Sequence, residues 1–186
     1  MEAGFEFQVI APHVEERFDV DLTVSELTAF NAIRKAMSVA RARPRDVVLA
    51  ADTLVAIDGE ILGKPRNIDH AVAMLRRLSG RSHEVCSAVF ICQLDRAKST
   101  TFHEVSEVQF RGLNHQAVRD YIDKVNPLDK AGAYAAQGFG SELSNGSTVL
   151  LPTLSVCRWK KQFPRSRNLE SNRNNVGPAR PLTSPN

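Results

Sequence analysis

Asp52 is the residue whose position most strongly suggests chemistry. It lies inside the apolar run of residues 50–55, where removing a carboxylate from water is costly unless a cation or hydrogen bonds compensate. Buried acids that have such partners concentrate at functional sites. The alternative is that the strand ends here and Asp52 faces water. If Asp52 is buried, it needs a cationic partner.

Lys64 is a candidate for that partner. It lies in Gly63-Lys64-Pro65, and the preceding turn dipeptide Asp58-Gly59 would fold it back toward Asp52. A lysine on a stiff loop suits phosphate binding as a point charge. The segment is not a Walker motif, however, and most lysines in loops are merely solvated.

A second unusual segment covers residues 129–138 and reads Asp-Lys-Ala-Gly-Ala-Tyr-Ala-Ala-Gln-Gly. Small residues surround Tyr134 and Gln137, and such a composition lets a backbone approach a ligand closely. A tight loop without a ligand explains the composition equally well.

Three other polar residues give no sign of chemistry by themselves. By composition alone, Glu15 and Lys35 are surface charges, and His83 is a structural residue in a turn.

Alternating helices and strands must position these residues. The capping-box pattern Thr23-Val-Ser-Glu26 begins a helix expected over residues 24–41. Strands are expected over residues 47–57, 83–94 and 101–110, and further helices after caps at Asp69 and Asn114. This alternation predicts an α/β domain, with a mixed, twisted sheet and flanking helices.

Charge and composition exclude several classes of protein. The net charge of +3 arises from residues 160–186, where six Lys or Arg face one Glu, so residues 1–159 carry about −2. The body therefore gives no sign of a nucleic-acid surface. No apolar run approaches the length that spans a bilayer, and three cysteines without a CxxC pair fit a reducing cytoplasm.

Four ordered motifs together resemble the Maf family of nucleoside triphosphate pyrophosphatases. They are Ala51-Asp52-Thr53, the Gly59-Glu-Ile-Leu-Gly-Lys-Pro65 segment, Leu78-Ser-Gly-Arg-Ser-His-Glu-Val85 with Ala73-Met-Leu75 before it, and residues 129–138. Val14-Glu15-Glu16 and Lys35-Ala36 also fall where that family has an acidic and a Lys-Ala motif. The resemblance implies the elongated α/β fold shared with inosine triphosphate pyrophosphatases, and often a homodimer.

The resemblance also implies an activity and its residues. The reaction is hydrolysis of a nucleoside triphosphate between the α and β phosphates with a divalent cation, Mg or Mn. Asp52 would accept a proton from water or hold the metal, Glu15 would help hold the metal, and Lys35 and Lys64 would neutralise phosphate charge. The Tyr-x-x-Gln-Gly segment that contains Gln137 resembles the branch that acts on dTTP and UTP. A carboxamide also matches the edge of uracil or thymine, and modified pyrimidine triphosphates are a further candidate substrate. Thr53 is the second specificity position.

Two departures from the family pattern lead us to expect impaired turnover. The family opens with a strand and a Ser-x-Ser-Pro-Arg-Arg loop that contacts the triphosphate, and this chain begins after that point. Its closing Ser-Asn-Val-Val-Gly-Leu-Pro strand is also not visible after Gly140. We therefore expect a Maf-like domain over residues 1–140, a divergent segment over 141–159 and a basic, disordered tail over 160–186.

Codon degeneracy offers a cause for the second departure. When the third base of each codon is read with the first two bases of the next, the peptide from Ser144 to Lys160 permits a segment that contains Ser-Asn-Val-Val-Gly-Leu-Pro. We therefore predict that residues from about Ser141 onward are translated in a shifted frame.

The alternative to the enzyme is a non-catalytic nucleotide-binding or cell-division regulatory protein of the same fold.

Overall fold

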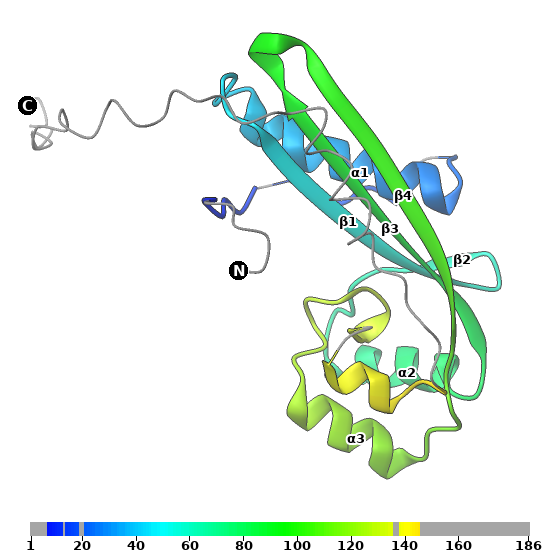
Figure 1. Cartoon of the computed structure of the whole chain (residues 1–186). Coiled ribbons are helices and arrows are strands. Elements are labelled where there is room, and N and C mark those ends of the chain that lie inside the picture. Colours follow the sequence, from blue (N-terminus) through cyan, green and yellow to red (C-terminus); the bar gives the residue numbers. More distant parts are fainter. Residues whose placement is uncertain (1–6, 13, 19–20, 136–137, 146–186) are drawn as a thin grey trace, which may run out of the picture. The chain divides into compact units, whose positions relative to one another are not determined.

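The computed structural model describes residues 7–12, 14–18, 21–135 and 138–145. The first helix, α1 (Val24–Ala40), begins as expected at a capping box, in which the Glu26 N–H donates to the Thr23 hydroxyl and the Thr23 N–H donates to the Glu26 carboxylate. Its buried face carries mostly small residues together with Leu27, Thr28 and Asn31. Small side chains let α1 pack closely against the strands beneath it (Figure 1).

A hairpin connects the strand that carries Asp52 to the loop that carries Lys64. Strand β1 (Val48–Ile57) turns at Asp58 and Gly59, which both have positive φ, into the short strand β2 (Glu60–Leu62). Two successive residues with positive φ are typical of a turn whose twist matches that of the flanking strands. The predicted turn is confirmed, and it places Gly63 and Lys64 directly after β2.

The sheet has the order β2-β1-β3-β4. Strand β3 (Ser82–Gln93) lies between β1 and β4 (Lys98–Gln109), and in its register Asp52 is opposite Ala88. The α/β class is confirmed. All pairings among the described strands are antiparallel, so the parallel pair of a mixed sheet is not seen in this part of the chain. Short turns make β1 and β2, and β3 and β4, antiparallel, and β1 also runs antiparallel to β3 across the connection through β2 and α2.

Two further helices and three short 3-10 helices complete the secondary structure of the described residues. They are α2 (Ile68–Leu78), η1 (Leu94–Arg96), α3 (His115–Lys124), η2 (Ala131–Ala133) and η3 (Gly138–Glu142). Asn114 caps α3 as expected, but the cap of α2 was wrongly predicted. Asn67 takes that role, because its side-chain oxygen accepts the His70 N–H at 2.8 Å, and Asp69 lies in the first turn.

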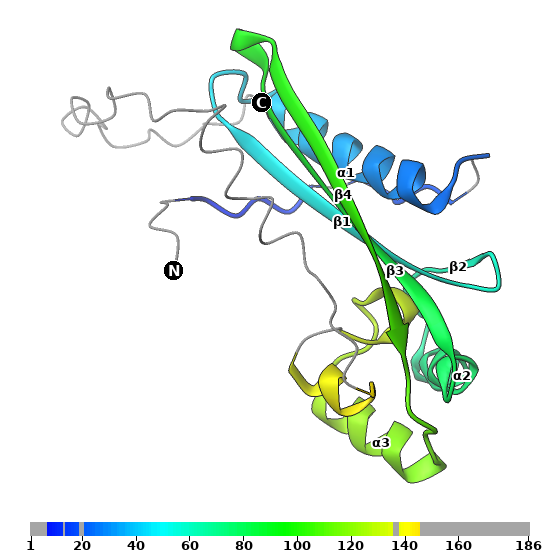
Figure 2. The same ribbon diagram turned by 45° about the vertical axis from the view of Figure 1, so that its right-hand side comes forward.

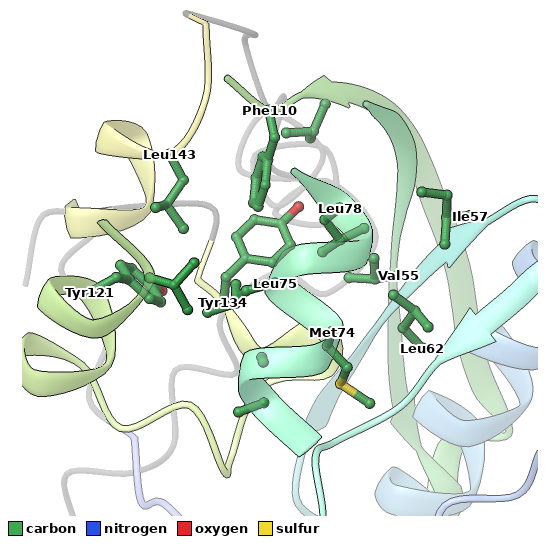
Figure 3. Close-up of a cluster of buried hydrophobic side chains, with 14 of the residues drawn as sticks. Val55, Ile57, Leu62, Met74, Leu75, Leu78, Phe110, Tyr121, Tyr134 and Leu143 are labelled. Carbon is green, nitrogen blue, oxygen red and sulfur yellow. The ribbon is translucent and has the colours of Figure 1, made fainter. Parts of the chain in front are cut away.

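Two clusters of buried apolar side chains lie along the sheet. One joins α1 to β1 and β3 through Ala32, Ala36, Val48, Ala88 and Phe90, among others. The other joins α2 and α3 to the far ends of the strands, as Figures 2 and 3 show, and includes Val55, Leu75, Phe110, Tyr134 and Leu143. On β1, Asp52 lies between the residues of the first cluster and those of the second.

The structure also bears on the domain boundary, the cysteines and membrane spans. The boundary at residue 140 stays a prediction, since Leu143 is buried in the second cluster and Ser144 bridges to Phe110, whereas residues 146–186 lie outside the described residues. Cys86 and Cys92 are free and buried. No helix within the described ranges is long and apolar enough to cross a membrane.

Candidate active site

Asp52 is buried and has the cationic partner that its position demands. Its residue is only 5% exposed, because its side chain points from β1 toward α1. The partner is Lys35, whose Nζ forms an ion pair with Asp52 Oδ1. Lys35 lies one turn after Asn31 and beside the buried face of α1, so the helix itself delivers the ammonium group to the strand.

Glu16 joins this pair to Lys64. Its Oε1 atom lies 2.9 Å from Lys35 Nζ and 2.8 Å from Lys64 Nζ. Lys64 thus does fold back toward the site, as the Asp58-Gly59 turn predicted, but it meets Glu16 rather than Asp52. The result is a chain of alternating charges, Asp52, Lys35, Glu16 and Lys64, which we call the ion-pair cluster.

The charges in the ion-pair cluster shift the pKa values of its members. Burial raises the pKa of Asp52, and this effect exceeds the opposing effect of the Lys35 hydrogen bond and charge. Burial also acts to lower the pKa of Lys35, but hydrogen bonds to Asp52 and Glu16 outweigh it and the pKa is raised. Asp52 therefore binds a proton more readily than an exposed aspartate does, which suits a group that must accept one.

Glu16 behaves in the opposite way. Burial acts to raise its pKa, but hydrogen bonds from Lys64 and Lys35 and their charges lower the pKa below its ordinary value. The two carboxylates of the ion-pair cluster therefore differ in basicity. Glu16 stays ionised over a wider pH range, as a permanent ligand for cations should, whereas Asp52 is the better proton acceptor.

The ion-pair cluster has features that fit a divalent cation. Asp52 Oδ2 is buried and has no hydrogen-bond partner among the residues that the structure describes. No group of three or more metal-ligating side chains is found in the same ranges. Two carboxylates suffice for Mg²⁺, however, which is commonly held by one or two carboxylates together with substrate phosphates and water.

The charge balance of the ion-pair cluster also favours a divalent cation. Two carboxylates and two ammonium groups cancel, so the ion-pair cluster alone cannot neutralise the four negative charges or so of a nucleoside triphosphate. A divalent cation held by Glu16 and Asp52 would release Lys35 and Lys64 for the phosphates. The donor set therefore fits the group that the sequence predicted.

Glu15, which the family resemblance implies as a metal ligand, lies outside the ion-pair cluster. Its side chain is exposed, and its backbone carbonyl accepts a hydrogen bond from Arg34 Nη1 at 2.8 Å. The neighbouring Glu16 places its carboxylate in the ion-pair cluster, and the metal-ligand role of Glu15 stays a prediction. Sequence reasoning missed Glu16 because two adjacent acids in a segment without periodicity give no signal of which one faces the protein.

Thr53, the predicted specificity residue, faces away from the ion-pair cluster. Successive side chains of a strand point to opposite faces, so Thr53 lies on the face opposite α1, where its hydroxyl is 2.9 Å from Ser87 Oγ. Gln137, the other predicted specificity residue, lies outside the described residues. Both specificity roles stay predictions.

The segment that precedes Gln137 is tied to the loop of Lys64. The N–H of Gly132 donates to the Gly63 carbonyl at 3.1 Å. Gly132 has φ +65°, and a Cβ there would come within 3.1 Å of Val55. The small residue at position 132 thus permits close packing within the protein, as the tight-loop interpretation expected, and approach of this segment to a ligand stays a prediction.

Tyr134 anchors the same segment inside the second apolar cluster. Its hydroxyl lies 2.6 Å from His83 Nε2, and its ring packs edge-on against Phe110 (Figure 3). His83 is 3% exposed, and burial lowers its pKa from 6.5 to about 4. His83 lies in β3 rather than in a turn, and its burial against Tyr134 supports a structural role.

Comparison with known proteins places this chain in a family. The profile of Maf-like proteins matches residues 1–147. A dTTP/UTP pyrophosphatase from Bacillus velezensis is 42% identical over 163 residues, covering 84% of this chain and 85% of that protein. Proteins of the same name from Bacillus mycoides and Carboxydothermus hydrogenoformans are 40% and 42% identical, covering 87% and 73% of this chain and 86% and 72% of their own lengths. The chain therefore belongs to the Maf-like protein family.

Proposed function

We propose that this chain is a nucleoside triphosphate pyrophosphatase that hydrolyses dTTP and UTP to the nucleoside monophosphate and pyrophosphate. The observation that carries the proposal is the ion-pair cluster, in which buried Asp52 pairs with Lys35 and a second carboxylate, Glu16, bridges Lys35 to Lys64. The relatives named dTTP/UTP pyrophosphatases, at about 40% identity over most of the chain, support the reaction and the substrate class.

Asp52 is the reactive group in this proposal. Its Oδ1 atom is engaged by Lys35, so Oδ2 is the atom left to take a proton from the attacking water or to bind a cation. A bound Mg²⁺ or Mn²⁺ would supply Lewis-acid polarisation of a phosphoryl oxygen and lower the pKa of bound water. Glu16 and Asp52 are the residues that would hold it.

Lys35 and Lys64 bind and orient the phosphates. Each carries an ammonium group with three donors, so it can bind a phosphate oxygen where it stands and without a change of protonation. Charge that develops on the leaving pyrophosphate is stabilised most by cations that are already in place and need no reorganisation. Lys35, held between two carboxylates, is such a cation, and Lys64 on its loop completes the pair.

We assign the selection of the substrate's nucleobase to Gln137 and Thr53. A carboxamide offers both a donor and an acceptor, which matches the carbonyl and N3–H of uracil or thymine. Modified pyrimidine triphosphates that keep this edge are included in the substrate class. The proposal further includes a homodimer in a reducing cytoplasm that does not bind nucleic acid.

The test is product analysis with dTTP, UTP and GTP, with Mg²⁺ or Mn²⁺ present, beside a binding titration of each nucleotide. We expect monophosphate and pyrophosphate as products, with both pyrimidine nucleotides turned over faster than GTP. Formation of diphosphate and inorganic phosphate would contradict the proposed bond cleavage. Binding without any product would contradict the enzyme and favour a nucleotide-binding protein.

A further inference from the structure

The residues that carry Glu16 form no helix or strand. Residues 14–18 have irregular backbone, so no ladder of their own fixes the direction of the Glu16 side chain. A carboxylate that must meet two ammonium groups within hydrogen-bond distance nevertheless requires a fixed backbone. The question is therefore which groups hold this segment.

Asn31 of α1 provides the first attachment. Its Oδ1 atom accepts the backbone N–H of Arg17 at 3.1 Å, and its Nδ2 atom donates to the backbone carbonyl of Arg17 at 3.2 Å. One side chain thus satisfies both backbone groups of the residue directly after Glu16, as a neighbouring strand would. Asn31 is only 1% exposed, and a buried amide is retained where both of its functions are used.

Arg34 provides the second attachment, from the other side. Its Nη1 atom donates to the backbone carbonyl of Glu15 at 2.8 Å. The backbone is therefore held immediately before and immediately after Glu16. The next residue of the helix, Lys35, reaches the Glu16 carboxylate itself.

We propose that Asn31 and Arg34 are positioning residues that hold the Glu16 carboxylate between Lys35 and Lys64, and thereby set the affinity of the site for a divalent cation. One helix then carries both a lysine of the ion-pair cluster and the attachments of its second carboxylate. The statement about cation affinity rests on the proposed function, whereas the statement about Glu16 does not.

The first test needs neither metal nor nucleotide. The lysine amines are acylated with a small activated ester, and the acylation rate of each lysine is followed by peptide mass spectrometry. We expect Asn31→Leu, which is close in shape but cannot hydrogen-bond, to raise the rate at Lys64 by about two- to fivefold, the range that loss of a half-exposed ion pair supports. Glu16→Gln should raise that rate equally, and the double variant should show no further increase.

Thr28→Val is the matched control. Thr28 is buried on the same face of α1 one turn earlier, but its hydroxyl bonds within the helix to the Val24 carbonyl at 2.6 Å. It should leave the rate at Lys64 unchanged, and the exposed Lys98 should react equally in all variants. An Asn31→Leu protein with a wild-type rate at Lys64 would overturn the proposal.

Arg34→Ala decides the matter if Asn31→Leu does not fold. Its side chain is not buried in the core, so we expect a folded protein with a smaller rise at Lys64, and no rise would overturn the proposal. In the second test, Asn31→Leu should raise the Mg²⁺ concentration for half-maximal pyrophosphate release about tenfold or more, as loss of an outer-shell partner does. Inactivity of the wild-type protein would refute the proposed function and leave the acylation result standing.

Discussion

His83 makes the stability of the protein depend on pH in a way that can be calculated. The imidazole is buried among Phe110, Tyr134 and their neighbours, and burial lowers its pKa from 6.5 to about 4. A group whose pKa is lower in the folded state stabilises the fold above the pKa of the unfolded state. That stabilisation is lost as pH falls from 6.5 toward 4, because the unfolded chain binds the proton first.

The magnitude follows from the two pKa values. The gap between 6.5 and about 4 corresponds to about 3 kcal/mol in total. Between pH 7 and pH 5, the unfolded state gains its proton while the folded state hardly does. The contribution of His83 to the free energy of unfolding should therefore fall by about 2 kcal/mol over this interval.

The variant His83→Gln isolates this contribution. Glutamine carries an amide near the position of Nε2, so it can keep a hydrogen bond to Tyr134, but it does not titrate. Urea unfolding of both proteins at pH 7 and pH 5 gives four free energies, and the titration of all other groups cancels in the difference between the proteins. The wild-type protein should lose about 2 kcal/mol more than the variant. A difference between the two proteins that is the same at both pH values would refute the buried, neutral imidazole.

Three further predictions concern the site and the core. Glu16→Gln should raise the Mg²⁺ requirement of pyrophosphate release about tenfold or more, whereas the matched Glu15→Gln should not; equal effects in Mg²⁺ titrations would contradict the placement of Glu16. Gln137→Glu should cost about 1 to 3 kcal/mol of selectivity for UTP over GTP, measured as a ratio of kcat/KM values, and an unchanged ratio would remove Gln137 as a base reader. Leu75→Ala should lower the free energy of unfolding by about 2 to 5 kcal/mol, because Leu75 is fully buried, whereas Leu128→Ala, at an exposed position, should cost much less; similar losses in urea unfolding would argue against the second apolar cluster.

The main elements could be predicted because local patterns determine them. The capping box at Thr23, the Asp58-Gly59 turn and the Asn114 cap each act within a few residues, and the structure confirms all three. The cap of α2 was misplaced because Asn67 and Asp69 are both good capping residues. Only the geometry shows that Asn67 accepts the His70 N–H.

The site could be predicted only where an unusual residue marked it. Asp52 inside an apolar strand indicates a partner, and the family resemblance identified Lys35 and Lys64. Glu16 and Asn31 gave no such signal, because their importance depends on contacts between an irregular segment and a helix. Asn31 lies 14 residues from Arg17, and no local rule connects the two.

The most direct test of this account is turnover by Asp52→Asn. Asparagine keeps the shape of the side chain but loses its charge and basicity, so pyrophosphate release from saturating UTP should fall by about 10²- to 10⁴-fold, the contribution typical of a general base. Thermal melts of both proteins establish that the variant is folded. Binding of UTP, measured by titration calorimetry, should change little. A folded variant that releases pyrophosphate at close to the wild-type rate would contradict the assignment of Asp52 as the reactive group.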